Sequence, residues 1–278
     1  MKVIVTFASK MLSLEMNIDQ NIQDWLVQLP PISLDEMGGI KLMNRTDTKF
    51  VTNKEHLANL LELAQGQYYA QQIGDSRMAN YRTVYWDTIA HRFFLEHHNT
   101  RSPRQKIRVR TYLDSDLTFL EVKTKNNHGR TKKKRITVPS QERQDVVDAG
   151  GSDFTQGLTG VTFDDIIPTV QNRFQRITLV NKGKTERLTI DFNVAFHNFE
   201  TDTDADTGNL VIIELKHDGN VFSPVLDILR ELRVQASGFS KYCIGSVMTN
   251  GDLKNNLFKP KLVRISKLTG YDFALKRK

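Results

Sequence analysis

Residues 106–125 read KIRVRTYLDSDLTFLEVKTK, and this stretch decides the fold expected for the chain. Successive side chains of a β-strand point to opposite faces, so Lys106, Arg108 and Arg110 share one face and apolar residues fill the other. The second half alternates in the same way and places three more charged residues on one face: Glu121, Lys123 and Lys125. The Asp-Ser-Asp sequence at 114–116 suits a turn, so the two halves predict an antiparallel hairpin with one charged face.

The same alternation recurs in four other segments. They are RTDTK at 45–49, KKRITV at 133–138, RLTIDF at 187–192 and VIIELK at 211–216. Strands of this kind do not suit an ordinary sandwich, because burying unpaired charge costs too much free energy. We therefore predict an α+β fold in which an antiparallel β-barrel, or tunnel, has a charged lumen and is flanked by helices that cover its apolar faces.

The predicted lumen is strongly cationic. Nine cations are expected to line it: Arg45, Lys49, Arg108, Arg110, Lys123, Lys125, Arg135, Arg187 and Lys216. Four carboxylates are expected beside them: Asp47, Glu121, Asp191 and Glu214. Such a lumen suits a polyanion, and its few carboxylates suit a hard divalent cation that bridges to that polyanion.

Composition limits the possible environments and partners. The 278 residues carry a formal net charge of +7, which favours an anionic partner. Cys243 is the single cysteine, which excludes an internal disulfide and a cysteine-rich zinc site and fits a reducing compartment. No run approaches the roughly 20 apolar residues of a membrane span, and we identify no secretion signal. We expect a cytoplasmic protein without a membrane span of its own; a membrane partner and the oligomeric state stay open.

The sequence also predicts domains and helices. Asp19 can cap a helix with Ile22, Leu26 and Leu29 on one side, so we divide the chain into an N-terminal helical extension (1–31) and a single domain (32–278). Residues 52–55 resemble a capping box, and Ser223-Pro224 is a typical helix start. Residues 141–178 are predicted to be mostly helical, with Pro168 near a helix N-terminus.

Several familiar chemistries are not supported. Gly183-Lys184-Thr185 ends like a phosphate-binding loop, but Thr178 stands where that motif requires glycine. Cys243 lies near no predicted base, so nucleophilic hydrolysis has no support. Nucleic-acid binding is disfavoured because the cations alternate with apolar residues inside strands and form no exposed aromatic platform.

Five motifs occur in an order that resembles a known family. They are RTDTKF at 45–50, KIRVRTY at 106–112, LEVKTK at 120–125, IELK at 213–216 and SKY at 240–242. The series resembles the VTC domain, a polyphosphate polymerase domain of the triphosphate tunnel metalloenzymes, which are related to the CYTH proteins. The resemblance implies an antiparallel tunnel flanked by helices, with ATP or inorganic polyphosphate in the lumen and Mn²⁺ or Mg²⁺ as cofactor.

The resemblance also implies roles for individual residues. The residues implied in catalysis are Arg108, Arg110, Lys123 and Lys216, of which the two arginines resemble the pair that grips phosphate. Phosphate ligands are implied at Arg45, Lys49, Lys125, Arg135, Arg187 and Lys241. Metal binding is implied at Glu214 and, in second place, at Glu121. The first strand carries Arg45 and Asp47 where many tunnel enzymes carry two glutamates, which favours transfer over hydrolysis.

The sequence therefore predicts a polyphosphate-polymerase-like phosphotransferase that moves the ATP γ-phosphoryl group onto a growing polyphosphate chain. Two alternatives stay open. The same site can hydrolyse inorganic triphosphate or a nucleoside triphosphate, with water as the acceptor. A module that binds polyphosphate or inositol phosphates without turnover is the other alternative.

Overall fold

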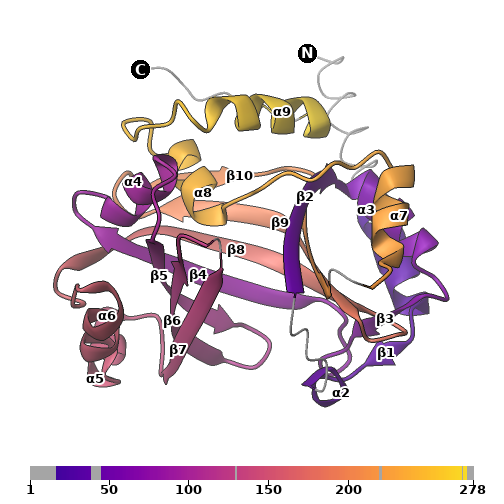
Figure 1. Cartoon of the computed structure of the whole chain (residues 1–278), viewed down its shortest axis with the longest axis horizontal. Helices are drawn as coiled ribbons and strands as arrows, with labels where there is room; N and C mark the ends of the chain where they lie inside the picture. Colours follow the sequence, from indigo (N-terminus) through magenta and orange to yellow (C-terminus); the bar gives the residue numbers. More distant parts are fainter. Residues whose placement is uncertain (1–16, 39–44, 129, 219–220, 271, 274–278) are drawn as a thin grey trace, which may run out of the picture. The chain divides into compact units, whose positions relative to one another are not determined.

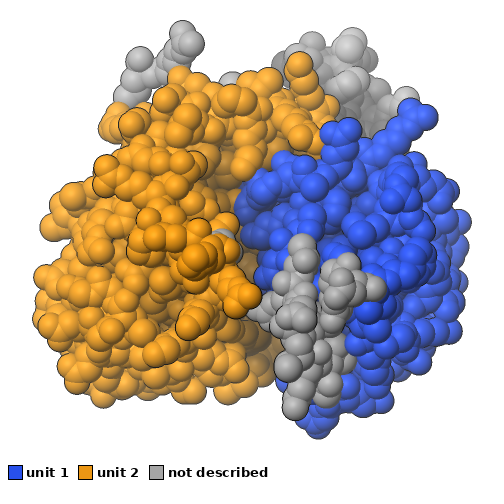
Figure 2. All heavy atoms as spheres, viewed as in Figure 1, with its two compact units in different colours: residues 1–78, 176–192, 209–239 blue, residues 79–175, 193–208, 240–278 orange. Residues whose placement is uncertain are grey.

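The computed structural model describes residues 17–38, 45–128, 130–218, 221–270 and 272–273. The chain divides into two compact units, coloured separately in Figure 2. Unit 1 comprises Met1–Met78, Arg176–Phe192 and Asn209–Phe239, and unit 2 comprises Ala79–Gln175, Asn193–Gly208 and Ser240–Lys278. Each unit is described by itself.

The strands form an antiparallel sheet in the order β2-β11-β9-β8-β4-β5-β6-β7 (Figure 1). Their bounds are β2 (Arg45–Asn53), β4 (Ala79–Thr88), β5 (Arg104–Tyr112), β6 (Leu117–Lys125), β7 (Thr131–Val138), β8 (Ile166–Asn181), β9 (Glu186–Asn198) and β11 (Leu210–Asp218). Short strands β1 (Pro31–Ile32), β3 (Tyr68–Gln71) and β10 (Thr203–Asp206) pair outside this order, and β1 runs parallel to β3.

The predicted α+β class, with a large antiparallel sheet and flanking helices, is confirmed. The strand order starts at β2 and ends at β7, and no pairing joins these two strands within the described residues. The sheet is therefore open there, not the closed barrel that alternation suggested. Side-chain alternation determines which residues share a face of the sheet, but it does not determine whether the sheet closes into a barrel. The charged lumen therefore stays a prediction.

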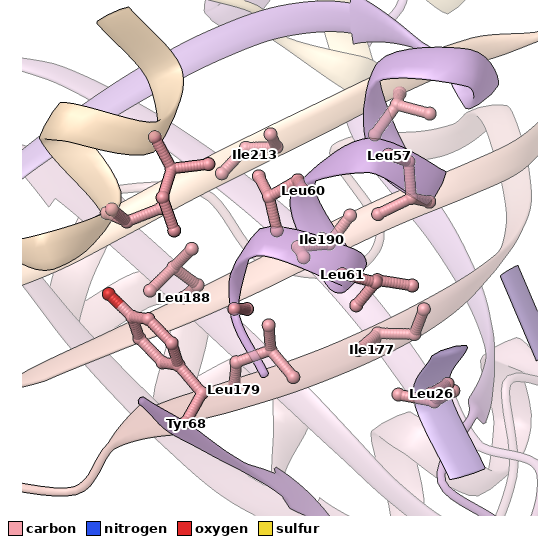
Figure 3. Packing of buried hydrophobic residues seen from close by; sticks show 14 of the residues in the cluster. Leu26, Leu57, Leu60, Leu61, Tyr68, Ile177, Leu179, Leu188, Ile190 and Ile213 are labelled. Atoms are coloured by element: carbon pink, nitrogen blue, oxygen red, sulfur yellow. The ribbon is translucent and has the colours of Figure 1, made fainter. Parts of the chain in front are cut away.

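Unit 1 has its apolar core on the sheet face opposite the charged one. The helical residues 17–28, α3 (Lys54–Leu63) and α7 (Pro224–Glu231) contribute to this core. Figure 3 shows Leu60 and Leu61 of α3 packed over strand residues such as Ile190. Each leucine that is fully buried contributes about 1.5–3 kcal/mol. The predicted apolar side of the first helix, with Leu26 at its centre, is buried in the same core.

The start of α3 differs from the prediction by one residue. The N-cap is Asn53, whose side chain accepts the backbone N–H of His56 at 3.0 Å. The hydroxyl of Thr52 bonds the His56 ring at 2.7 Å instead of capping the helix. At α7 the predicted start at Ser223-Pro224 is confirmed, although the serine side chain makes no capping bond.

Unit 2 contains the hairpin that opened the sequence analysis. β5 and β6 pair antiparallel with Arg108 opposite Glu121, and the apolar residues between the charged ones are buried, as predicted. Helices α5 (Arg143–Asp148) and α6 (Gly151–Thr159) supply Val146 and Phe154 to this core. The unit also contains α4 (Arg92–His98), α8 (Lys241–Thr249) and α9 (Lys259–Thr269); short α2 (Leu34–Gly38) belongs to unit 1.

The predicted helical stretch at 141–178 is wrong for its last third. Residues from Ile166 onward form β8, the longest strand, and Pro168 lies near its start, where a missing N–H is tolerated. Val170 and Phe174 are four residues apart, and that spacing puts them on one face of a helix and of a strand alike. Periodicity therefore could not distinguish a helix from a strand here. Pairing with neighbouring strands on both sides stabilises the strand.

Among the described residues, none of the helices has both the length and the apolar character that crossing a bilayer requires.

Candidate anion-binding site

The charged face of unit 2 is built by register. Lys106 lies opposite Lys123, and Lys123 lies opposite Lys133, which forms one row of cations across β5, β6 and β7. In the next row Arg108 lies opposite Glu121, and Glu121 lies opposite Arg135. Because every second residue of each strand lies on this face, the register gathers charges that are distant in sequence.

Glu121 is the buried anion at the centre of this face, with a side chain only 1% exposed. Its Oε2 accepts the Nε of Arg108 at 2.7 Å and also its Nη2, and its Oε1 accepts Lys133 Nζ at 2.9 Å. Burial alone would raise the pKa of Glu121, but Arg108, Arg110 and Lys133 hold it well below its usual range. The carboxylate therefore stays ionised and fixes the position of the Arg108 guanidinium.

Arg110 is held differently. Its Nε donates to the hydroxyl of Thr83 at 3.0 Å, and its guanidinium lies 5.6 Å from the ring centroids of Tyr81 and Phe174. The Nζ of Lys241 lies 4.3 Å from the centroid of the same Phe174 ring. This ring therefore brings a cation of α8 toward a cation of β5, and neither contact neutralises their charge.

The start of α8 adds to the positive potential. Ser240 is its N-cap and accepts the backbone N–H of Cys243, and the Nζ of Lys106 donates to the same hydroxyl at 2.8 Å. A helix N-terminus carries a partial positive charge and presents free backbone N–H groups, which favours anions. The SKY motif thus lies at the cationic face.

In unit 1 several charged residues pair with carboxylates. Glu214 accepts the ammonium of Lys216, and its second oxygen lies 3.6 Å from Lys49 Nζ. Arg176 donates to both oxygens of the buried Asp191, with Nη2 to Oδ2 at 2.8 Å. Burial lowers the pKa of Lys216, although the charge of Glu214 opposes this effect.

The predicted residues thus fall into two groups. The structure brings together Arg108, Arg110, Lys123, Lys125, Arg135 and Lys241 in unit 2. It places Lys49, Arg187, Lys216 and Glu214 in unit 1. Arg45 starts β2 in unit 1, but its side chain lies outside the described residues.

Three cations of these faces received no role in the predicted site: Lys106, Lys133 and Arg176. Lys106 and Lys133 stand two residues before Arg108 and Arg135, so alternation alone places them on the same faces. Arg176 was expected to reach the rim of the barrel from a helix, whereas it lies on strand β8. A strand assignment would have put it on the face of Phe174.

The two glutamates suggested for a metal ion differ in fit. Glu121 is buried and both of its oxygens accept cationic donors, so it does not fit a metal ion. Glu214 is more exposed, with Lys216 at Oε1 and Lys49 3.6 Å from Oε2, so it fits as a single protein ligand only if the ion displaces the longer of these contacts. Mg²⁺ often takes one or two carboxylates and fills its other positions with phosphate oxygens and water. The described residues contain no cluster of three or more metal-ligating side chains.

Comparison with known sequences identifies the family. The profile of the VTC domain matches residues 44–250, which is most of the chain. This chain belongs to the VTC domain family. The resemblance to the VTC domain that the motifs indicated is thereby confirmed. No curated protein matches this VTC domain in sequence.

Solved structures similar to this VTC domain include three with low identity. A candidate adenylate cyclase from Bacillus halodurans has 14% identity, a TM-score of 0.45, and coverage of 71% of this chain and 96% of its own. A candidate adenylyl cyclase from Hippeastrum, described as having a dominant triphosphatase activity, has 15% identity, a TM-score of 0.46, and coverage of 77% and 99%. The PH1819 protein from Pyrococcus horikoshii OT3 has 15% identity, a TM-score of 0.42, and coverage of 71% and 95%.

Proposed function

We propose that this VTC domain is a metal-dependent phosphotransferase that moves the γ-phosphoryl group of ATP onto a growing polyphosphate chain. The cationic face of unit 2 carries the proposal. Lys106, Lys123, Lys133, Arg108 and Arg135 lie side by side in the register, and Glu121 at their centre is already neutralised by its neighbours. Such a surface matches a substrate and a product that are both polyanions.

Phosphoryl transfer needs positioning and charge stabilisation more than covalent chemistry by the protein. A terminal oxygen of the acceptor chain attacks the γ-phosphorus in line, the bond to the bridging oxygen breaks, and ADP leaves with the electron pair. Arg108 and Arg110 stabilise the charge on the transferred group, and Lys123 and Lys241 hold the flanking phosphates. Arg108 is preorganised by Glu121, so it needs no reorganisation during the reaction.

Unit 1 supplies further phosphate contacts and the carboxylate for the metal ion. We assign phosphate contacts to Lys49, Arg187 and Lys216, and Glu214 is the carboxylate we assign to Mn²⁺ or Mg²⁺. Glu214 would hold a divalent ion, which would supply positive charge to offset that of the phosphates. Lys49 and Lys216 are salt-bridged to this same carboxylate, so they orient it.

The test is incubation of the purified protein with ATP and Mn²⁺, followed by a gel that resolves phosphate polymers and an assay of orthophosphate. We expect a polymer ladder with matching ADP. Arg110→Gln should reduce turnover by about a hundredfold, since removing one donor to the transition state costs about that much. The matched control is Lys132→Gln, an exposed cation on the other face of β7. Orthophosphate without a ladder would instead indicate a triphosphatase, and binding without turnover would indicate a sensor.

A further inference from the structure

Tyr85 is a buried tyrosine that the proposed mechanism does not use. It lies on β4 directly opposite Arg108 of β5, and it is 5% exposed. Its ring stacks on that of Tyr242 with centroids 4.9 Å apart. Its phenol group is hydrogen-bonded to the side chain of Arg108.

The surroundings of the Tyr85 hydroxyl supply donors. Charged groups acting on it are Arg108, Arg110 and Lys106 from β5 and Lys241 from α8. Arginine and lysine side chains donate hydrogen bonds and accept none. A neutral phenol can accept from Arg108 with its lone pairs, but its own proton finds no acceptor among these four groups.

The nearest carboxylate on the same strand is already saturated. Asp87 shares the face of Tyr85, and its Oδ1 accepts the backbone N–H groups of Thr88 and Phe93. Its Oδ2 accepts the backbone N–H of Phe94 and the hydroxyl of Tyr242. Each carboxylate oxygen has two lone pairs, so Asp87 has no capacity left for Tyr85.

We propose that Tyr85 is a phosphate-binding residue, whose neutral hydroxyl accepts from Arg108 and donates its proton to an oxygen of the bound polyphosphate. This inference rests on the proposed function, because it assumes that the polyanion occupies the face of unit 2. In the empty site, the hydroxyl lies among cations that favour its ionised form. Binding of the polyanion favours the neutral form, so binding is accompanied by proton uptake at pH values near the pKa of Tyr85.

The direction of titration agrees with this geometry. Burial alone would raise the pKa of Tyr85, but the four cations lower it below its ordinary value. Above that pKa the phenolate cannot donate, and its negative charge repels the bound polyanion. The contribution of Tyr85 to affinity is therefore favourable at low pH, and it is lost as the pH rises through the pKa. Ionisation of Tyr242 is opposed by burial and by Asp87, so Tyr242 stays neutral over this range.

The test uses the full chain with tripolyphosphate as the probe, in metal-free buffer, from about pH 7 to about pH 10, the ordinary pKa of tyrosine. Calorimetry gives the dissociation constants of the wild type, Tyr85→Phe and a matched control, Tyr69→Phe of unit 1. Phenylalanine keeps the ring that stacks on Tyr242. We expect Tyr85→Phe to bind about tenfold more weakly at low pH, the value of one hydrogen bond to a charged group. This difference should shrink as the pH rises and should reverse above the pKa of Tyr85, because the wild-type phenolate repels the polyanion and phenylalanine does not; the control follows the wild type throughout.

Tripolyphosphate and the lysines also titrate over this pH range, and they do so equally in all variants. Dividing the affinity of the wild type by that of Tyr85→Phe therefore cancels their effect. A ratio of one at every pH, or a ratio that does not change with pH, would overturn the inference. A second readout is the tyrosinate absorbance at alkaline pH, which should fall on binding in the wild type and stay constant in Tyr85→Phe. Arg110→Gln separates the two proposals. If it binds tripolyphosphate as the wild type does, the cationic face itself fails, and the role of Tyr85 fails with it.

Discussion

The two units carry charged sheet faces that differ in how their charges are balanced. In unit 1 the register sets Lys49 opposite Glu214 and Asp47 opposite Lys216, although Lys216 also lies opposite Arg187 on its other side. In unit 2 the register sets cations beside cations, as in the row of Lys106, Lys123 and Lys133. The same period-two alternation thus gives a nearly neutral face in one unit and a strongly cationic face in the other.

This difference indicates which face should bind an anion more favourably. A cation that already has a carboxylate partner must give up part of that interaction to bind phosphate. Cations without a matching number of carboxylates repel each other, and a polyanion relieves this repulsion. We therefore expect substitutions of paired residues in unit 1 to change stability as well as phosphate binding, and substitutions in unit 2 to change mainly anion binding, with Glu121 as the exception.

The largest expected effect is at Glu121, where Glu121→Gln removes the charge that balances the buried Arg108. Breaking one partner of a buried ion pair costs about 3–5 kcal/mol in the free energy of unfolding, measured by urea denaturation. The folded-state pKa of Glu121 is lowered, so its contribution is present above the unfolded pKa of about 4.3 and is lost as the pH falls through the folded value. The difference in the free energy of unfolding between Glu121→Gln and the wild type should therefore become smaller at acidic pH.

Glu62→Gln is the matched control, because Glu62 is exposed on α3. A loss below about 1 kcal/mol for Glu121→Gln would place this pair with surface ion pairs and would remove its assigned role in holding Arg108.

The second effect tests the pairing in unit 1. Arg176→Ala leaves Asp191, which is 4% exposed, without its bidentate partner. We expect a loss of about 3 kcal/mol in the free energy of unfolding. Arg173→Ala, three residues earlier and exposed, is the control and should stay within about 0.5 kcal/mol of the wild type. Equal losses in the two variants would contradict the pairing.

A smaller effect, on tripolyphosphate binding, is expected for two neighbouring lysines of β7 that lie on opposite faces. Lys133 and Lys132 are neighbours in sequence, are both exposed and face opposite sides of the strand. Lys133→Ala should weaken tripolyphosphate binding about threefold, because its charge is partly screened by solvent. Lys132→Ala should leave the dissociation constant unchanged at the same ionic strength. Similar losses for both lysines would show that general charge, not the face, determines binding.

The smallest effect is expected at Lys49. Its ammonium is 3.6 Å from Glu214 and its side chain is 37% exposed, so solvent screens the pair strongly. Lys49→Ala should change the free energy of unfolding by less than about 1 kcal/mol in thermal or urea unfolding. Lys54→Ala is the comparison variant, because Lys54 is 10% exposed and bonds Asp19 at 2.8 Å. It should lose more stability than Lys49→Ala, and the reverse order would show that exposure does not rank the ion pairs of unit 1.

The sequence by itself determined which residues share a face. Alternation at 106–125 and at 211–216 is a property of the extended backbone, so it follows from the order of residues alone. It predicted the antiparallel hairpin, the apolar cores under helices and most of the cations assigned to the site. The order of five short motifs identified the VTC domain, because such a series is far more specific than any one motif.

Only the tertiary structure decided which charges meet. Pairing of Arg108 with Glu121, and of Arg176 with Asp191, depends on the register between strands and on neighbours that are distant in sequence. The strand at Ile166–Asn181 was predicted partly as helix, because a four-residue spacing fits both periods and sheet partners are not visible locally. Tyr85 carried no signal of its own in the sequence, since a tyrosine in a strand is ordinary. Its surroundings become unusual only when β5 and α8 bring four cations to its hydroxyl group.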